Sequence, residues 1–469
     1  MNYLKKTAVC IAAILTAANS LGYMPYNPVG LPVLTAEAAD IVASGECGAE
    51  GDNVKWQLDS EGTLTISGEG AMPDHWCRSE QIPWYTQNTF SKVVIEEGVT
   101  DIGNFAFAEC KNLSSVTIPA SVKSVGGGAF NGCESLSEIT LPEGIDRISN
   151  SLFTDCSSLK SVVIPESVKS IGYKAFENCT NLEEMTIPES VNIFAGSAFN
   201  NSLWLKKQAE KNPIVIVNNI LISGKTCEGK VVIPDTVTSI NEEAFSENTD
   251  MTEIVIPDNV KSIGDHAFYS CGSLETITLP DTDIKIGNFV FNGCDKLVSV
   301  SLPDSITALP TGMFGNCHNL ESIVIPNTVT EIGEVCFNNC HKLKEIVIQD
   351  SVKTIGSAAF ENCVNLTSIT IENPECTIYD SKTTISNTAE IRGYANSTAQ
   401  AYAEKYSRKF AALEEKPETS GTFGENLKWN IDGDTLTISG EGAMPDHWCR
   451  VEQIPWYTQN TFSKVVIEE

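Results

Sequence analysis

The most chemically suggestive segment of the chain is Asp74-His75-Trp76-Cys77, which recurs as Asp446-His447-Trp448-Cys449. An imidazole that removes a proton from a thiol creates a nucleophilic thiolate, and a nearby carboxylate can orient the imidazole. The members of such a site normally meet through the fold and are not neighbours in sequence. We therefore interpret both copies as having a structural or recognition role, predict no catalytic residues and expect that the chain is not an enzyme.

Aromatic residues beside this motif offer a second kind of chemistry. Trp76, Trp84 and Tyr85 could form an exposed platform that stacks on a sugar or a protein, so they are included in the candidate binding surface. The favoured alternative is a half-buried core, because aromatic side chains bury large apolar areas.

A column of cysteines keeps a spacing of 23 residues, with Ser202 and Asn248 in place of two members. Neighbouring strands lie about 4.8 Å apart, so a disulfide between adjacent members is not impossible. A column of one residue type with polar substitutions favours buried free thiols that bond weakly to the backbone. Zinc would require close pairs such as C-x-x-C, and the sequence has none. The members are Cys110, Cys133, Cys156, Cys179, Cys271, Cys294, Cys317, Cys340 and Cys363.

Two further patterns could bind a cation. His318 and His341 are 23 residues apart and should stack on adjacent coils, but no further ligand is evident, so we expect a solvated pair. Acidic residues follow most strand-ending prolines, where turn chemistry is the favoured interpretation and calcium bridging is the alternative. We predict no metal and no cofactor. The acidic residues are Glu143, Glu166, Glu189, Asp235, Asp258, Asp281, Asp304 and Asp350.

Composition limits the classes of function. The 469 residues include 61 acidic and 31 basic side chains, and the formal charge of −30 makes nucleic-acid binding a poor hypothesis. A hydrophobic fraction of 42% excludes general disorder. No run after residue 40 is long and apolar enough for a membrane-spanning helix. The N-terminus has the features of a secretory signal peptide: Lys5 and Lys6, the apolar run 7–18 and the small-residue sites in Ala36-Glu37-Ala38-Ala39. We therefore expect a secreted or cell-surface protein.

The elements that position these residues come from a repeat. Ile-Pro or Leu-Pro pairs recur in steps of 23 or 46 residues from Ile118 to Ile325, and Ile95, Ile348 and Ile371 keep the register without the proline. A fixed short period is the signature of a solenoid, in which each coil buries its apolar face against its neighbours. We predict that short strands, such as residues 116–118, stack into a parallel sheet.

Two more columns shape each coil. A column of glycines is expected where a tight bend or a positive φ favours this residue. A column of phenylalanines is expected to form the spine of the core. The glycines are Gly103, Gly126, Gly172, Gly264, Gly287, Gly333 and Gly356, and the phenylalanines are Phe107, Phe130, Phe153, Phe176, Phe199, Phe245, Phe268, Phe291, Phe314, Phe337 and Phe360.

The full unit, L-x-x-I-x-I-P-x-x-V-x-x-I-G-x-x-A-F-x-x-C, resembles the BspA-type leucine-rich repeats of bacterial surface proteins from Ile95 to Ile371. The repeat and the resemblance predict a β-rich (α+β) solenoid: a right-handed leucine-rich-repeat superhelix of 23-residue coils with a parallel β-sheet. The changed pattern over residues 56–90 predicts a β-rich N-terminal cap, and the helical spacing of apolar residues over 399–410 after Ser397 predicts a helical C-terminal cap. The resemblance also implies a bacterial, non-catalytic extracellular array that mediates adhesion or recognition, and it identifies no ligand.

The sequence suggests a division into parts. We expect a signal peptide over 1–39, an N-terminal β cap over 40–94, the solenoid over 95–372, a helical cap over 373–413, a linker over 414–420 and a truncated second copy of the N-terminal cap over 421–469. The second copy follows from the identity of residues 435–450 with residues 63–78. An irregular insert at 202–231 should form a short helix and a hairpin within the register. The chain is expected to be a fragment of a longer protein.

The favoured hypothesis is a non-catalytic repeat protein that binds an extracellular protein or glycan through side chains that flank the strands and vary between coils. Two alternatives stay open: the targeting region of a larger secreted enzyme, and a structural component of the cell envelope. The ligand is undetermined, a monomer is the working assumption, and neither a nucleic-acid partner nor a transmembrane segment is expected. Besides the three aromatic residues, the candidates are Ser114, Ser115, Glu138, Lys160, Glu183, Glu184, Glu253, Glu275, Glu321, Lys344 and Glu345.

Overall fold

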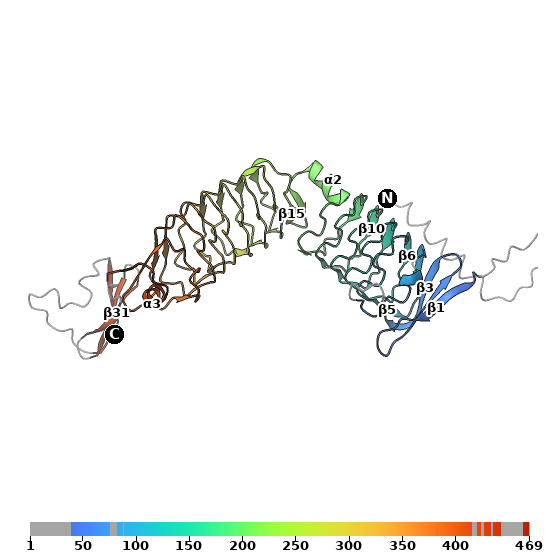
Figure 1. The fold of residues 1–469 in the computed structure, drawn as a ribbon, viewed down its shortest axis with the longest axis horizontal. Helices are drawn as coiled ribbons and strands as arrows, with labels where there is room; N and C mark the ends of the chain where they lie inside the picture. The colour runs from blue at the N-terminus through green and yellow to red at the C-terminus, as the bar shows by residue number, and fades with distance from the viewer. Residues whose placement is uncertain are drawn as a thin grey trace, which may run out of the picture.

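The computed structural model describes residues 39–75, 82–87, 89–414, 420–423, 426–432, 435–441 and 463–468, and all structural statements below concern these residues. They form an arch of stacked coils, with the N-terminal strands at one end and the C-terminal strands at the other (Figure 1). Several predicted features lie outside the described residues: residues 1–38 of the signal peptide, Trp76 and Cys77, the second copy of the motif at 446–449, and residues 415–419 of the linker.

The N-terminal strands are hydrogen-bonded directly into the solenoid. Three antiparallel strands are followed by two that pair in parallel with the third, and these two continue into the first coil. A short 3-10 turn, Tyr85–Gln87, precedes them. The strands are β1 (Ile41–Glu46), β2 (Asn53–Asp59), β3 (Thr63–Ala71), β4 (Lys92–Ile95) and β5 (Val99–Ile102).

Most coils contribute one strand to a first ladder, at the position of the Ile-Pro motif; in the coil of Ile325 the equivalent residues 322–324 form no strand. The register of these parallel pairs matches the sequence period, since Ser161 lies opposite both Glu138 and Glu184. The predicted solenoid with parallel sheets is confirmed. The strands of the first ladder after β4 are β6 (Ser115–Thr117), β8 (Glu138–Thr140), β10 (Ser161–Val163), β12 (Glu184–Thr186), β16 (Gly229–Val232), β18 (Met251–Val255), β20 (Thr276–Thr278), β22 (Ser299–Ser301), β25 (Glu345–Ile348), β27 (Ser368–Ile371), β29 (Glu390–Gly393) and β30 (Phe410–Ala412).

A second ladder of shorter strands follows the turn after each proline. Its pairs are also parallel, as in Ile148 opposite Ile171. After β5, its strands are β7 (Ser124–Val125), β9 (Arg147–Ile148), β11 (Ser170–Ile171), β13 (Ile193–Phe194), β15 (Ile220–Ser223), β17 (Ser239–Ile240), β19 (Ser262–Ile263), β21 (Lys285–Ile286), β23 (Ala308–Leu309), β24 (Glu331–Ile332), β26 (Thr354–Ile355) and β28 (Thr377–Ile378).

The phenylalanine column forms the spine of the core, as predicted. Phe107 and Phe130 are fully buried, their ring centroids lie 5.6 Å apart and their planes differ by 7°. The same near-parallel stacking continues to Phe199 and resumes from Phe245 to Phe360. Each ring thereby covers the next one along the axis of the solenoid.

The cysteine column is buried and free, as predicted. The thiol of Cys156 donates a hydrogen bond to the carbonyl of Phe130 at 3.1 Å, and Cys317 does the same to Phe291. The donor and acceptor come from successive coils, so every such thiol joins one coil to the coil before it. The same bond is made by Cys133, Cys179, Cys271, Cys294, Cys340 and Cys363.

The glycine column was expected at a tight bend or at a positive φ. These glycines do not have a positive φ, so another cause is needed. A Cβ on Gly264 would lie 2.5 Å from the backbone nitrogen of Glu242, and a Cβ on Gly356 would lie 2.6 Å from that of Glu334. Close approach of the preceding coil therefore favours glycine there. Positive φ occurs instead at two other columns, which include non-glycine residues such as Lys174 (φ 56°).

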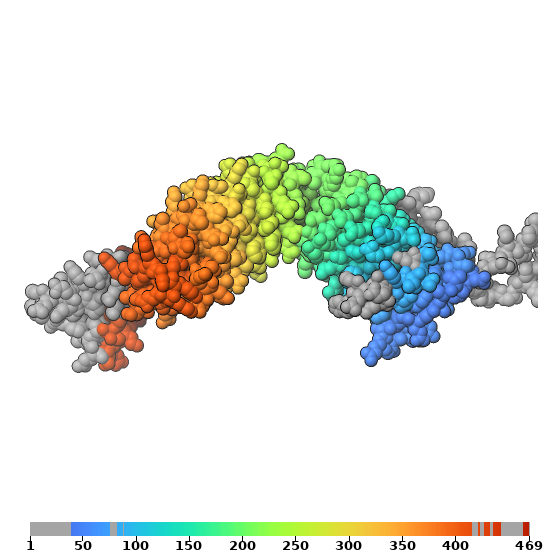
Figure 2. Space-filling view, viewed as in Figure 1, coloured from blue at the N-terminus to red at the C-terminus, as the bar shows by residue number. Residues whose placement is uncertain are grey.

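The regular stacking is interrupted between Phe199 and Phe245. Helix α2 (Leu203–Lys211) occupies the place of a strand in the first ladder, and an antiparallel hairpin of β14 (Val215–Val217) and β15 follows it. Ile222 stands at the position of the missing phenylalanine. The buried apolar residues of the solenoid form two clusters: one extends from Cys47 to Ile222 and the other from Leu221 to Ala403. A third, small cluster lies in the C-terminal strands. In Figures 1 and 2 this segment lies at the top of the arch.

The C-terminal part begins with α3 (Thr398–Lys405), which buries Ala399, Tyr402 and Ala403. The strands beyond β30 repeat the pairing of β1 to β4, because Trp429 lies opposite Ile438 as Trp56 lies opposite Ile66. These strands are β31 (Ser420–Phe423), β32 (Leu427–Asp432), β33 (Thr435–Gly440) and β34 (Lys464–Ile467). In the part of the chain that the structure describes, no helix is long and apolar enough to span a membrane.

Candidate binding face

The first ladder presents a polar and partly apolar sheet face to solvent. In β10 the side chain of Val162 is buried, whereas Ser161 and Val163 point outward, and the other strands alternate in the same way. We call the outward residues of the first ladder the ladder face. Its members are Ser115, Thr117, Glu138, Thr140, Ser161, Val163, Glu184, Thr186, Lys230, Val232, Glu253, Val255, Thr276, Thr278, Ser299, Ser301, Ser322, Val324, Glu345 and Val347, all exposed or half-exposed.

The structure places the predicted strand-flanking residues on this face or at its margin. Five of them are members of the ladder face: Ser115, Glu138, Glu184, Glu253 and Glu345. The other six lie one residue before a strand or its equivalent position: Ser114, Lys160, Glu183, Glu275, Glu321 and Lys344. The parallel register aligns each of these two sets into a column.

Some of the predicted residues already have charged partners. Glu253 is half-exposed, and its carboxylate lies 2.7 Å from the ammonium of Lys230 on the neighbouring strand. Glu183 is 3.3 Å from Lys207 of α2. Such exposed pairs contribute little to stability, so the carboxylates can exchange these partners for others.

The ladder face also carries exposed valines that the sequence analysis did not include. The exposed fractions of Val163, Val232 and Val324 are 58%, 57% and 80%, and those of Val255 and Val347 are 39% and 43%. Their signal was present in the sequence, because an apolar residue at the outward position of V-V-I or I-V-I breaks the expected alternation. Exposed apolar residues that gather on one face are typical of interaction surfaces.

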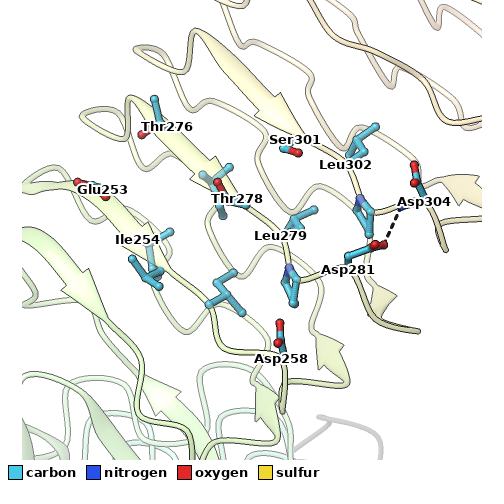
Figure 3. A pocket seen from close by; sticks show the side chains of 15 residues that line it. Glu253, Ile254, Asp258, Thr276, Thr278, Leu279, Asp281, Ser301, Leu302 and Asp304 are labelled. Atoms are coloured by element: carbon cyan, nitrogen blue, oxygen red, sulfur yellow. Dashed lines mark hydrogen bonds between the residues drawn. The ribbon is translucent and has the colours of Figure 1, made fainter.

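A shallow groove of about 580 Å³ lies over β18, β20 and β22. Thr276, Thr278 and Ser301 line it from the strands, and Asp258, Asp281 and Asp304 line it from the turns that follow (Figure 3). None of its lining residues is a lysine or an arginine. The backbone N–H of Asp304 donates to the Asp281 carboxylate at 3.1 Å, which is the turn chemistry expected for this column.

The Asp74-His75 part of the sequence motif attaches the N-terminal strands to the first coil. The Asp74 carboxylate accepts the N–H of Asn104 at 2.8 Å, and the N–H of His75 donates to the Asn104 carbonyl at 2.9 Å. Burial lowers the pKa of His75 because it disfavours the charged imidazolium, while the charge of Asp74 acts in the opposite direction. These contacts support the structural interpretation of this motif.

The aromatic candidates separate into core and surface. Trp84 is fully buried, stacked on Phe107 at 5.4 Å and in edge contact with Trp56 at 6.3 Å, so its inclusion in a binding surface was wrong and its role is in the core. Tyr85 is 36% exposed. Trp76 lies outside the described residues. No aromatic platform that includes Trp84 can therefore form.

The histidine pair is stacked as expected, with ring centroids 4.5 Å apart. His318 Nδ1 lies 2.5 Å from the carboxylate of Asp295 on the preceding coil. Among the residues that the structure describes, no group of three or more His, Cys, Asp or Glu side chains could hold a metal ion.

A family comparison agrees with this repeat architecture. A family model described as "BspA type Leucine rich repeat region" matches in six copies, over residues 83–206, 224–343 and 307–398. A leucine-rich repeat protein from Eubacterium ventriosum is 26% identical, with 72% of this chain and 96% of that chain covered and a TM-score of 0.46. A leucine rich cell surface protein from Faecalibacterium prausnitzii is also 26% identical, with the same coverage and a TM-score of 0.40. None of the curated proteins matches the chain.

Proposed function

The chain belongs to the BspA-type leucine-rich repeat family of bacterial surface proteins, and on this premise we propose that it is a secreted or cell-surface, non-catalytic module that binds a macromolecule over its ladder face. The family gives the class of function, namely recognition or adhesion. The ladder face is the surface through which this chain would bind its partner.

The composition of the ladder face is the observation that carries this proposal. Each strand already uses its inward residues for the core, so the outward residues are free of any packing role. Five of them are valines at least 39% exposed, in a face that also holds carboxylates and hydroxyls. Two of these valines, Val232 and Val255, lie opposite each other on paired strands. Exposed apolar area is unfavourable in water, and apolar residues that adjoin on a surface are typical of interaction sites.

Charge reversal on two faces tests the proposal. Glu184→Lys with Glu345→Lys changes the ladder face, and Asp146→Lys with Glu331→Lys changes equally exposed carboxylates in or beside the second ladder. We expect the full chain to bind immobilised extracellular-matrix proteins or glycans, and only the first double variant to lose binding. Equal loss in both variants, or no loss in either, would contradict the ladder face as the binding surface, provided that both variants melt like the parent chain.

A further inference from the structure

We infer that the partner of the ladder face is a cationic polypeptide, bound in extended form across β16, β18, β20 and β22. This inference rests on the proposed function and adds the chemistry of the partner. Two rows of side chains carry it: an uncharged row on the strands and an acidic row on the turns that follow.

The uncharged row consists of the second outward residue of each of these four strands. Val232 lies opposite Val255, Val255 opposite Thr278, and Thr278 opposite Ser301. Paired strands place such residues about 4.8 Å apart, so the row is continuous across the four strands. The exposed methyl groups of Val232, Val255 and Thr278 favour valine or threonine side chains of a partner, because covering apolar surface is favourable in water.

The acidic row consists of Asp235, Asp258, Asp281 and Asp304, which are all exposed and one coil apart. Figure 3 shows the last three side by side at one end of the groove, beyond the strands. The groove that they line contains no basic side chain, and Lys230 is already paired with Glu253 at its margin. Basic side chains of a partner therefore meet carboxylates without displacing a lysine of this chain.

The two rows together favour a polypeptide over other polymers. An extended peptide that crosses the strands presents alternate residues to its two sides. Its apolar residues can therefore cover the uncharged row while its basic residues reach the acidic row. Nucleic acids and acidic glycans carry the wrong charge for this row, and the formal charge of −30 opposes their approach.

The test uses the full chain and two fluorescent peptides. In one peptide lysine alternates with valine and threonine, and in the other glutamate replaces every lysine. We expect the lysine peptide to bind, with affinity that falls as salt rises, and the glutamate peptide not to bind. The triple variant Asp258→Asn, Asp281→Asn and Asp304→Asn should bind the lysine peptide about tenfold more weakly, because it loses three exposed ion pairs that each contribute modestly to binding.

A matched control lies in the other half of the solenoid. Glu143→Gln, Glu166→Gln and Glu189→Gln neutralise the same turn column and should leave peptide binding unchanged. Val255→Thr should weaken binding severalfold through the uncharged row without changing the charge. Equal effects of the two triple variants, equal binding of both peptides, or tighter binding of heparin than of the lysine peptide would each overturn the inference.

The same variants separate this inference from the proposed function. If the aspartate variants retain the lysine peptide while Glu184→Lys with Glu345→Lys still abolishes binding to matrix proteins or glycans, the cationic partner is wrong and the ladder face stands. If the ladder-face reversal has no effect on either readout, the proposed function is contradicted as well.

Discussion

The cysteine column shows how one side chain type serves two purposes in a tight stack. The thiol is small and apolar enough for a fully buried site. Its weak S–H donor gives a second hydrogen bond to a carbonyl that already accepts a backbone N–H within its own coil, as Phe130 does from Cys133. Ser202 and Asn248 replace it only beside the irregular insert. There Asn248 donates to the carbonyls of Gly224 and Cys227, so the substitution supplies the hydrogen bonds that a thiol could not.

Burial of these thiols predicts a loss of stability at high pH. Burial raises the pKa of Cys110, Cys179 and Cys363 from 9.0 to about 12, because a thiolate is poorly solvated in the core. The folded chain thus keeps protons that the unfolded chain releases above pH 9. The contribution of these thiols to the free energy of unfolding should not change with pH below pH 9. Between pH 9 and about pH 12 the free energy of unfolding should fall by about 1.4 kcal/mol per pH unit for each thiol.

Urea denaturation from pH 8 to pH 11 measures this loss. The triple variant Cys110→Ala, Cys179→Ala and Cys363→Ala should be less stable at pH 8 but should lose stability more slowly as the pH rises. Other groups titrate in the same range, so the comparison of the two slopes isolates the thiols. Parallel slopes for the parent and the variant would show that the thiols do not carry the pH dependence.

Trp84 and Tyr85 provide a second test at the scale of single residues. Trp84→Ala should destabilise the chain by about 3–5 kcal/mol, because it removes a fully buried ring from the stack above Phe107. Tyr85→Ala should change stability by less than about 1 kcal/mol, because its ring is partly exposed. Thermal melting checks both values. A larger effect of Tyr85→Ala would contradict the assignment of Trp84 to the core.

At the level of elements, the sequence predicts the features that are marked by the same residue type in every coil, and it misses those that no residue type marks. The spacing of Phe130, Cys133 and Ile118 predicts the register of coils, the spine and the thiol column. It does not predict the positive φ of Phe289 or Val335, because those positions carry many residue types and no glycine pattern. The turn geometry of the coil imposes that conformation on bulky residues, although it costs about 1–2 kcal/mol each.

The candidate site was predictable to a similar extent. The column that contains Glu138 and Glu184 follows from the register of the repeat. The groove depends on the depth of the turns beside the strands, and no pattern of residue types encodes that depth. Trp84 was misplaced for a related reason. An aromatic residue near an unpaired end of a solenoid suits either a core or a surface, and only the contact with Phe107 decides between them.

Helix α2 depends on a residue that breaks the cysteine column. The Ser202 hydroxyl donates to the Phe199 carbonyl at 2.7 Å and accepts the N–H of Leu205 at 3.2 Å, so it closes the coil and caps the helix at once. Ser202→Ala should cost about 1 kcal/mol. Ser202→Cys should recover little of this, because a thiol is a weak acceptor, whereas Ser202→Thr should recover most of it. Urea denaturation of the three variants checks the order, and a stable Ser202→Cys variant would contradict the capping role.

On the scale of the whole molecule, α2 and its hairpin join two cores rather than continue one. Strand β15 belongs to both, since Leu221 lies in the second cluster while Ile220 and Ile222 lie in the first. Specific hydrogen bonding also crosses the insert, since the N–H of Gly196 donates to the Glu242 carboxylate at 2.9 Å. The hairpin itself is bonded to the first half, because the Asn218 amide donates to the carbonyls of Pro188 and Val191. In a stack where each coil contacts only its neighbours, such a boundary weakens cooperativity.

The chain should therefore unfold in two separable steps. Phe130→Ala removes a ring from the first core and Phe291→Ala removes one from the second, and each should cost about 3–5 kcal/mol in its own half. Hydrogen exchange read by mass spectrometry should show faster exchange in residues 91–200 for the first variant and in residues 240–370 for the second. The parent chain is the reference for both. Faster exchange in both halves of either variant would mean that the insert transmits stability and that the solenoid unfolds as one unit.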